Sequence, residues 1–469
     1  MSRTVSAELS GAPFYPPRVA PPPKAPNLLQ LFARSFGNPL RAIPERVYRD
    51  PLVVVRGPPP IVWVTEPALI KAVLVDRRDD FPQDPLLRRV LGGLFGDGIL
   101  TSEGWHWRWQ YQAVAPLFRH DEVLRYVPAM VASAETVIKR WSSAPPGSIC
   151  DIDSDMVNAT YEVISNTLLG SGSAAVGETM KRASAQYVAG IPWSVAYAAL
   201  NLPAWLPRPG RRRMRMWESR LRGAVAEMIS EHRVPTGRDD LFTRLISAVN
   251  PETGKTMPED QILDNVLTFL LAGHQTVAMT LIWTLYLISQ APDWEVRLLQ
   301  EIQQVVPTGQ VTGENIERLV TVQQVLKESM RLYPPIPVMS RQAARDVDLA
   351  GEHIKAGTLV GLPTYAIHRH LRLWDDPDRF DPSRFSPERE ANCSRYQFMP
   401  FGAGPRICIG AAFALVEATA MLATLVRAVR FESTPQRQPI PISRVVLMPK
   451  DGMTLRVTLR DRARTFGFA

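Results

Sequence analysis

The sequence FMPFGAGPRICIGAAFALVEA, from Phe398 to Ala418, contains the clearest signal in the chain. It surrounds one cysteine, Cys408, with glycines and an arginine, and an apolar helical segment follows directly. Glycine lets a backbone curl closely round a sulfur atom. Free N–H groups at the start of the helix stabilise negative charge there. The segment therefore predicts a loop that holds Cys408 as a thiolate, the form of cysteine that binds metals and attacks as a nucleophile.

The other cysteines and histidines restrict the chemistry of this thiol. The 469 residues include three cysteines, Cys150, Cys393 and Cys408, which are too few for a disulfide framework and lack the Cys-x-x-Cys spacing of zinc sites. A catalytic thiol needs a nearby base, and His368 and His370 lie in a different segment. A buried inert cysteine is the usual alternative, but the frame of glycines and an arginine disfavours it.

This loop resembles the haem-binding loop of the cytochrome P-450 family, FxxGxRxCxG. Six residues in order carry the resemblance: Phe401, Gly402, Gly404, Arg406, Cys408 and Gly410. The resemblance implies that Cys408 is the axial thiolate ligand of the iron in haem b, a ligand that favours O–O cleavage. It also implies that Phe401 packs beside the sulfur and that Arg406 reaches a haem propionate.

Four further residues match landmarks of the same family. KESMR places Glu328 and Arg331 at i and i+3 on one helix face. An exposed pair of this kind would contribute little to stability. The resemblance instead implies a buried pair bonded to a third arginine, Arg384 in DPSRF, with a structural role in supporting the cysteine loop. It also implies that Arg341, in PVMSRQAARD, pairs with a propionate.

The most apolar part of the chain is VLTFLLAGHQTVAMTLIWTLYLIS, residues 266–289. Polar residues at its centre would be unfavourable in lipid, so it predicts a long helix buried in a soluble protein. LAGHQT resembles the oxygen-binding stretch of the family. The resemblance implies that Ala272 and Gly273 let the helix pass close over the haem. It also implies that the Thr276 hydroxyl bonds a backbone carbonyl, opens the helix locally and holds oxygen or water. The alternative is an ordinary buried threonine.

Two positions depart from the family pattern. Gln275 stands where the family usually has an acid, and an amide cannot take up or release a proton near neutral pH. Proton delivery then runs through Thr276 and water, or the natural oxidant is peroxide. His274 is expected to face away from the iron in a packing role.

The second departure lies in GWHWRWQYQAVAPLF, residues 104–118. Trp107 stands where the family has a propionate-binding tryptophan, but Tyr111 stands where an arginine is expected. Arg108 is the candidate to compensate for the missing charge.

The whole pattern predicts a mainly α protein with a minor β part. Residues 1–27 form a Pro-rich segment that is expected to be extended and to lack a signal peptide or membrane anchor. Residues 28–469 are expected to form one domain of the cytochrome P-450 fold, with haem between the long helix and the cysteine loop. Residues 50–66 predict two short strands. The end of the chain, RVVLMPKDGMTLRVTLRDR, predicts a hairpin with a Lys-Asp-Gly turn.

The resemblance implies a haem-thiolate monooxygenase that inserts one oxygen atom from O2 into a hydrophobic small molecule by hydroxylation or epoxidation. No Gly-rich dinucleotide fingerprint is present. Electrons are therefore expected from NAD(P)H through a separate reductase and a ferredoxin or flavodoxin-type protein. The net charge of +8 suits an acidic partner. The Arg208–Arg220 cluster predicts a solvated helix start rather than nucleic-acid binding.

Apolar segments at 82–100, 185–205 and 334–340, together with the long helix before Thr276, are expected to form the substrate pocket. Fatty acids, terpenoids and steroid-like molecules remain open as substrates. We expect a cytoplasmic monomer. Two alternatives stay open: a peroxide-driven peroxygenase of the same fold, and a non-catalytic haem-binding protein on the same frame.

Overall fold

The structure is a computed structural model that describes most of the chain. The described residues are 12–27, 30, 33–34, 36–57, 60–168, 206–207, 209–232, 241–250, 252–434 and 438–460, together with 179, 183, 190, 193, 194 and 197. The apolar segment 185–205 therefore lies mostly outside the described residues.

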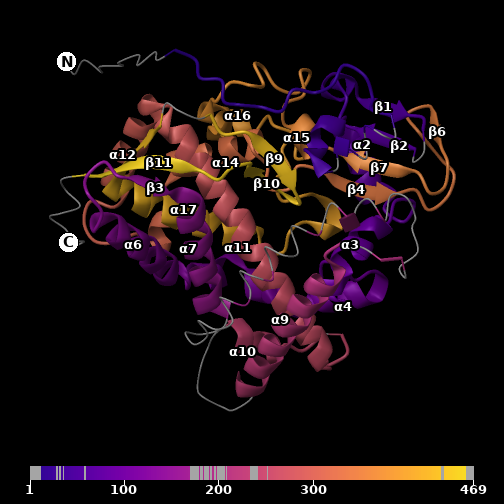
Figure 1. Ribbon diagram of the computed structural model, residues 1–469, viewed down its shortest axis with the longest axis horizontal. Coiled ribbons are helices and arrows are strands. Elements are labelled where there is room, and N and C mark those ends of the chain that lie inside the picture. The colour runs from indigo at the N-terminus through magenta and orange to yellow at the C-terminus, as the bar shows by residue number, and fades with distance from the viewer. Residues whose placement is uncertain are drawn as a thin grey trace.

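A long central helix, α11 (Glu259–Ser289), organises the helical part of the molecule. It packs against α7 (Ile152–Leu168), α14 (Val320–Leu332) and α17 (Ala411–Ala428). Its side chains are buried on nearly all sides along both halves, as its apolar composition predicts. Figure 1 shows α11 crossing the molecule, with α7 and α17 beside it, α6 further out on the left and the main sheet to the right.

Shorter helices complete this part of the fold. The α-helices are α2 (Pro67–Lys71), α3 (Pro85–Phe95), α4 (Gly104–Val114), α5 (His120–Leu124), α6 (Val127–Ser142), α9 (Arg211–His232), α10 (Leu241–Ile246), α12 (Pro292–Val305), α13 (Gly313–Ile316), α15 (Thr364–Ile367) and α16 (Pro387–Glu390). The single-turn elements are η1 (Pro39–Ala42), η2 (Glu45–Tyr48), η3 (Ala72–Asp76), η4 (Ala115–Phe118), η5 (Pro382–Phe385) and η6 (Gly404–Arg406). The predicted mainly α class is confirmed.

The strands within the described part of the chain form four small sheets. The largest has the order β1-β2-β7-β4, from β1 (Leu52–Val55), β2 (Ile61–Val64), β7 (Leu359–Leu362) and β4 (Met339–Gln342). β3 (Ile149–Asp151), β11 (Thr454–Leu459) and β8 (Val429–Ser433) form a second sheet, in the order β3-β11-β8. β5 (Val347–Leu349) pairs with β6 (Glu352–Ile354), and β9 (Pro441–Arg444) pairs with β10 (Val446–Pro449). The two strands predicted within residues 50–66 are confirmed as β1 and β2.

The predicted C-terminal hairpin is wrong. β10 turns back on β9 through Val445, whose φ is 90°, and β11 pairs with β3 and β8 instead. The Lys-Asp-Gly segment does turn the chain, with Gly452 at φ 74°. It directs β11 to a different sheet, where Leu455 and Val457 bury one face of the strand. The turn residues were recognised correctly, but they do not determine which strand pairs with β10.

Among the residues that the structure describes, two helices, α11 and α17, are long and apolar enough to cross a membrane. In this fold 78% and 72% of their most apolar windows, respectively, are buried inside the protein. Both therefore have the burial of core helices. Such burial agrees with the expectation that residues 266–289 lie inside the protein.

Candidate functional site

The cysteine loop is a tight turn fixed by its own backbone and by a neighbouring element. The backbone N–H of Cys408 donates to the carbonyl of Phe401 at 2.9 Å, which closes the loop. Gly402 and Gly404 have φ values of 75° and 76°, in the region that favours glycine. A Cβ at Gly404 would lie 2.7 Å from the carbonyl oxygen of Leu74 in η3. The loop can therefore approach η3 closely only with glycine at position 404.

Cys408 is an exposed residue, most of the surrounding loop is half-buried, Ala403 is buried, and α17 behind the loop is mostly buried. Enough protein surrounds the sulfur that burial raises the pKa of the thiol, while the backbone N–H of Gly410 opposes that shift. Gly410 itself is the N-cap residue of α17, with φ −87°, so it is not a left-handed glycine. A bound metal cation deprotonates a ligating thiol outright. The loop thus presents a sulfur that a metal can bind.

Within the mostly buried helix α11, the sequence LAGHQT (residues 271–276) contains the more exposed side chains. Ala272 is exposed, and Thr276 is half-buried, whereas the residues on both flanks are buried. The Thr276 hydroxyl donates to the carbonyl of Ala272 at 2.9 Å, and α11 is continuous through this bond. The expected side-chain-to-carbonyl bond is present, and the helix assignment shows no local opening. Ala272 and Thr276 therefore belong to the accessible part of an otherwise mostly buried stretch of α11.

Gly273 faces a different neighbour from Ala272. A Cβ at Gly273 would lie 3.0 Å from the Cδ1 atom of Ile164 in α7. The small size of Gly273 therefore lets α7 and α11 approach each other.

The two residues between Gly273 and Thr276 differ in burial. His274 is buried, its Nδ1 lies 2.6 Å from the carbonyl oxygen of Leu270, and burial lowers its pKa. Its ring meets Tyr161 of α7 edge-on, with the ring centroids 6.0 Å apart. Gln275 is half-buried and makes no hydrogen bond to another described side chain or backbone group. His274 is thus a packing residue, and Gln275 leaves an amide free to bind water.

Two arginines from distant segments form a positive cluster. The Arg406 guanidinium donates to the carbonyl of Ser102 at 2.7 Å and lies over the Trp107 ring, 4.7 Å from its centroid. Arg341 donates to the carbonyl of Ser340 at 2.8 Å. Burial, and next the charge of Arg341, lower the pKa of Arg406 to about 10. Neither guanidinium forms an ion pair with a carboxylate among the described residues. The cluster is therefore suited to anionic groups from a ligand.

Trp107 and Arg108, both in the 104–118 segment, lie in different surroundings. Trp107 packs against Tyr111, with ring centroids 5.2 Å apart, so the tyrosine supports the tryptophan under Arg406. Arg108 is exposed and makes no hydrogen bond or ion pair with another described residue. The structure therefore brings Trp107 to the arginine cluster and leaves Arg108 on the surface.

Glu328, Arg331 and Arg384 come together in the core. The Arg331 guanidinium donates to both carboxylate oxygens of Glu328, at 2.7 and 2.8 Å, and both side chains are fully buried. Arg384 lies 3.6 Å from Glu328. Arg331 also donates to the carbonyls of His368 and Pro377, both at 2.7 Å. The group therefore ties α14 to the segment that leads to the cysteine loop.

A further polar network was not predicted from the sequence. Asp264 and Asn265, on α11, accept hydrogen bonds from the backbone N–H groups of Asp97 and Ile99, at 2.7 and 3.0 Å. Asp264 also pairs with Arg222 of α9 at 2.8 Å. A Cβ at Gly96 would lie 2.1 Å from the Asp264 carboxylate. The glycines of LFGDGIL were the available signal. The network fixes residues 96–102, which also hold Arg406 through Ser102.

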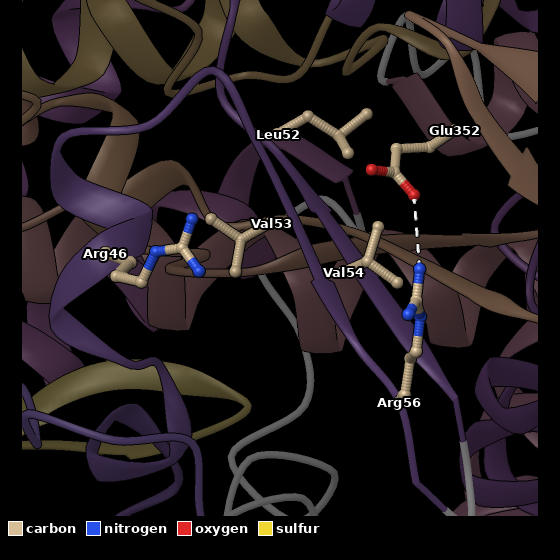
Figure 2. Close-up of a pocket in the computed structure, with 6 residues that line it drawn as sticks. All are labelled: Arg46, Leu52, Val53, Val54, Arg56 and Glu352. Atoms are coloured by element: carbon tan, nitrogen blue, oxygen red, sulfur yellow. Dashed lines mark ion pairs between the residues drawn. The ribbon is translucent and has the colours of Figure 1, made fainter.

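These features fit haem b. The loop presents a thiol that would ligate the iron, the arginine cluster presents two cations that would pair with the propionates, and α11 presents an exposed small residue and a hydroxyl. The described residues contain no other cluster of His, Cys, Asp and Glu side chains able to hold a metal ion. A surface hollow of about 320 Å³ beside β1, with Arg56 and Glu352 3.8 Å apart, shares no lining residue with this site (Figure 2).

Comparisons with known proteins agree with this fit. The family model for cytochrome P-450 matches residues 20–457. Cyclooctat-9-en-7-ol 5-monooxygenase of Streptomyces melanosporofaciens is 31% identical over 90% of this chain and 94% of its own. Pentalenene oxygenase of Streptomyces avermitilis is 29% identical over 90% and 93%, respectively. 11-oxo-beta-amyrin 30-oxidase of Glycyrrhiza uralensis is 30% identical over 84% and 78%. The crystal structure of the cytochrome P-450DA haem domain superposes with a TM-score of 0.81, at 25% identity, over 95% of this chain and 98% of that chain.

The fold, the thiolate loop and the comparisons together define a haem-thiolate oxygenase. The chain belongs to the cytochrome P-450 family. It is a cytochrome P-450 monooxygenase whose cofactor is haem b.

Proposed function

We propose that this protein inserts one oxygen atom from O2 into a cyclic terpenoid, with electrons from NAD(P)H delivered by a separate ferredoxin or flavodoxin-type protein and its reductase. The observation that carries the proposal is the exposed residue Cys408 in a glycine-framed loop, combined with the exposed Ala272 and the fixed Thr276 hydroxyl on α11. We also propose a cytoplasmic location, because the two helices apolar enough for a bilayer are largely buried.

Different side chains of the site bind different parts of the cofactor. Cys408 is the proposed iron ligand, and the Gly410 N–H bond to its sulfur stabilises negative charge there. Arg406 and Arg341 hold the propionates, and Trp107 stacks under Arg406 and fixes its direction. Phe401 closes the loop through its carbonyl. When bound, haem supplies the activation of oxygen, which no side chain provides.

Glu328, Arg331 and Arg384 have a proposed structural role. Their bonds fix the main chain of residues 376–381, since Glu328 also accepts the N–H of Asp381 at 2.8 Å. Removing Glu328 would leave the two buried arginines without the carboxylate that they share.

The distal residues hold water and oxygen in place. Thr276 is anchored to the Ala272 carbonyl, so its oxygen can accept a hydrogen bond from water and orient it. Gln275 can orient a second water but cannot exchange a proton with it. We therefore propose that protons arrive from solvent through water ordered by Thr276 and Gln275.

A terpenoid substrate is favoured by two observations. Three relatives are named for reactions on cyclooctat-9-en-7-ol, pentalenene and 11-oxo-beta-amyrin, which are terpenoids. The half-buried side chains of Leu87, Val90, Leu271, Ile336 and Val338 pack on the core in the segments expected to line the pocket, and all are apolar. An apolar pocket of this kind binds a rigid hydrocarbon by desolvation.

Titration of the purified haem protein with terpenoids, fatty acids and steroids tests this substrate class. We expect the low-to-high-spin shift in the haem spectrum, which reports loss of water from the iron, to be strongest with cyclic terpenoids. A stronger shift with fatty acids or steroids would contradict the proposal. Turnover of the best binder with NADPH, reductase and an acidic ferredoxin then tests the electron route, and its rate should fall with added salt.

The peroxygenase alternative is motivated by Gln275. It predicts that hydrogen peroxide alone supports faster product formation than O2 with the complete electron-transfer system. The non-catalytic alternative predicts no product with either oxidant. One product assay with both oxidants therefore separates all three functions.

A further inference from the structure

The Pro-rich N-terminal segment is packed on the domain through its backbone and side chains. Residues 12–22 have no regular secondary structure, and Pro16 and Val19 are buried. Figure 1 shows this indigo segment running across the top of the molecule. Residues 12–19 precede the part of the chain that the family model matches. Their contacts are therefore features of this chain rather than of the matched pattern.

The segment holds residues 376–380 from the outside. Phe14 accepts the backbone N–H of Phe380 at 3.0 Å, and the Tyr15 hydroxyl donates to the Asp376 carboxylate at 2.9 Å. Arg18 pairs with Asp378 at 2.6 Å. From the inside, the same five residues are held by arginines: Arg331 binds the carbonyls of Pro377 and Arg379, and Arg384 binds that of Asp376. These five residues are thus fixed between the N-terminal segment and the core.

The segment also reaches two buried tyrosines. The Tyr333 hydroxyl donates to the Pro17 carbonyl at 2.7 Å, and the Tyr365 hydroxyl accepts the Val19 N–H at 3.0 Å. Tyr333 is stacked on Trp283 of α11, with ring centroids 3.8 Å apart. The segment is therefore connected to α14 and α11 as well as to residues 376–380.

A continuous set of contacts leads from Arg18 to the cysteine loop. Asp378, the partner of Arg18, also pairs with the buried Arg369 at 3.6 Å. The preceding residue, His368, accepts the backbone N–H of Met399 at 3.0 Å through Nε2. Met399 lies two residues before Phe401, whose carbonyl receives the Cys408 N–H. A packed network of this kind can transmit a constraint between its ends.

We propose that residues 12–19 are a strap that positions the Cys408 loop by fixing residues 376–380 and the Arg369–His368 pair. Tyr15 and Arg18 are positioning residues, since they act on the loop only through other residues. The inference rests on the proposed function in one respect: Cys408 must be the thiolate ligand of the haem. The strap then keeps the loop in the conformation in which the sulfur stays bound to iron.

The test uses the full-length haem protein with Tyr15→Phe and Arg18→Gln combined, with Lys24→Gln as the control. Lys24 is exposed in the same Pro-rich segment and forms no hydrogen bond or ion pair with another described residue. Two quantities are measured below the unfolding temperature: the fraction of the carbon monoxide complex with the thiolate-ligated absorption band, and hydrogen exchange of amides 376–380 and 399–408.

We expect the double variant to raise the non-thiolate fraction severalfold and to speed exchange in both segments, while far-UV circular dichroism and the control are unchanged. Deletion of residues 2–19 should give a larger change in the same direction. Unchanged thiolate fraction and exchange in the double variant and the deletion would overturn the inference. So would losses that appear only together with global unfolding. If the unmodified protein lacked the thiolate band, the proposed function would fail instead, so the two failures are distinguishable.

Discussion

The Arg331 guanidinium binds both oxygens of the Glu328 carboxylate in a site that water does not reach. An exposed pair at i and i+3 would add little to stability. This pair has a larger effect because each partner would be left as an uncompensated buried charge without the other. It also supplies hydrogen bonds to three backbone carbonyls, of His368, Pro377 and Arg379, so its loss would free the chain that leads to the cysteine loop.

We therefore expect Glu328→Gln to lower the free energy of unfolding by about 3–5 kcal/mol, the usual cost of breaking a buried ion pair. Denaturant unfolding of the variant and the parent measures this difference. Glu388→Gln is the control, since Glu388 is exposed on α16 and its removal should change the stability by less than about 0.5 kcal/mol. Equal effects of the two substitutions would contradict the structural role of Glu328.

Two glycines separate the effect of backbone conformation from that of close contact. Gly404 and Gly357 have φ values of 76° and 82°, so alanine costs about 1–2 kcal/mol at each. Only at Gly404 would the new Cβ meet a backbone atom, the Leu74 oxygen at 2.7 Å; nothing lies within 4 Å at Gly357. Gly404→Ala should therefore lower the free energy of unfolding by about 1–3 kcal/mol more than Gly357→Ala does. Thermal unfolding of the two variants measures the difference, and similar losses would show that the contact relaxes freely.

Gln275→Glu tests whether proton delivery limits turnover. A carboxylate at this position can exchange protons with ordered water, and a positioned proton donor contributes roughly 10²-fold or more to such steps. We expect the variant to raise the rate of product formation with O2 and NADPH severalfold. The rate of product formation with hydrogen peroxide should not change. Gln275→Asn, which changes length without adding an acid, should not raise either rate. A gain with peroxide of the same size would contradict a role in proton delivery.

The burial of His368 leads us to expect that the folded protein loses stability in mild acid. Burial, followed by the charge of Arg331, lowers its pKa to about 3, well below the ordinary value near 6.5. Below its ordinary pKa, His368 is therefore protonated in the unfolded chain but stays neutral in the folded protein. The free energy of unfolding should fall as the pH drops below about 6.5, by up to about 1.4 kcal/mol per pH unit.

The buried His274 adds to this trend, and Asp153, whose pKa burial raises to about 6, opposes it. Unfolding of His368→Asn between about pH 6.5 and 4 isolates the contribution of His368. Its slope should be shallower than that of the unmodified protein, whereas the exposed His106→Asn should keep the original slope. Identical slopes for all three proteins would show that His368 is not held neutral in the fold.

The parts of the site that the sequence predicted are those in which residue type and spacing jointly determine the geometry. Cys408 with its glycines requires a tight loop, and Glu328 with Arg331 shares a helix face in any α-helix. The structure brings Arg384 to that pair and Arg341 to Arg406. A buried helix over residues 266–289 followed from its hydropathy together with the polar residues at its centre.

Features that depend on contacts between distant segments were missed. Nothing in APFYPPRV indicates that Tyr15 meets Asp376, because the two residues are separated by most of the chain. The contacts of Asp264 with Arg222 and with the Asp97 N–H also join segments that are distant in the sequence. The close approach of Gly273 to Ile164 was likewise not foreseen, because it depends on how α7 packs against α11. The C-terminal hairpin failed because local turn chemistry does not determine which strand is the partner.

The central claim is that Cys408 is the thiolate ligand of the haem. The absorption spectrum of the reduced carbon monoxide complex tests it most directly, because the band position reports whether a thiolate is bound to iron. The account predicts the thiolate band in the unmodified protein and in Cys393→Ser and Cys150→Ser, and its loss in Cys408→Ser. A thiolate band that persists in Cys408→Ser, or that is absent from the unmodified protein, would contradict the account.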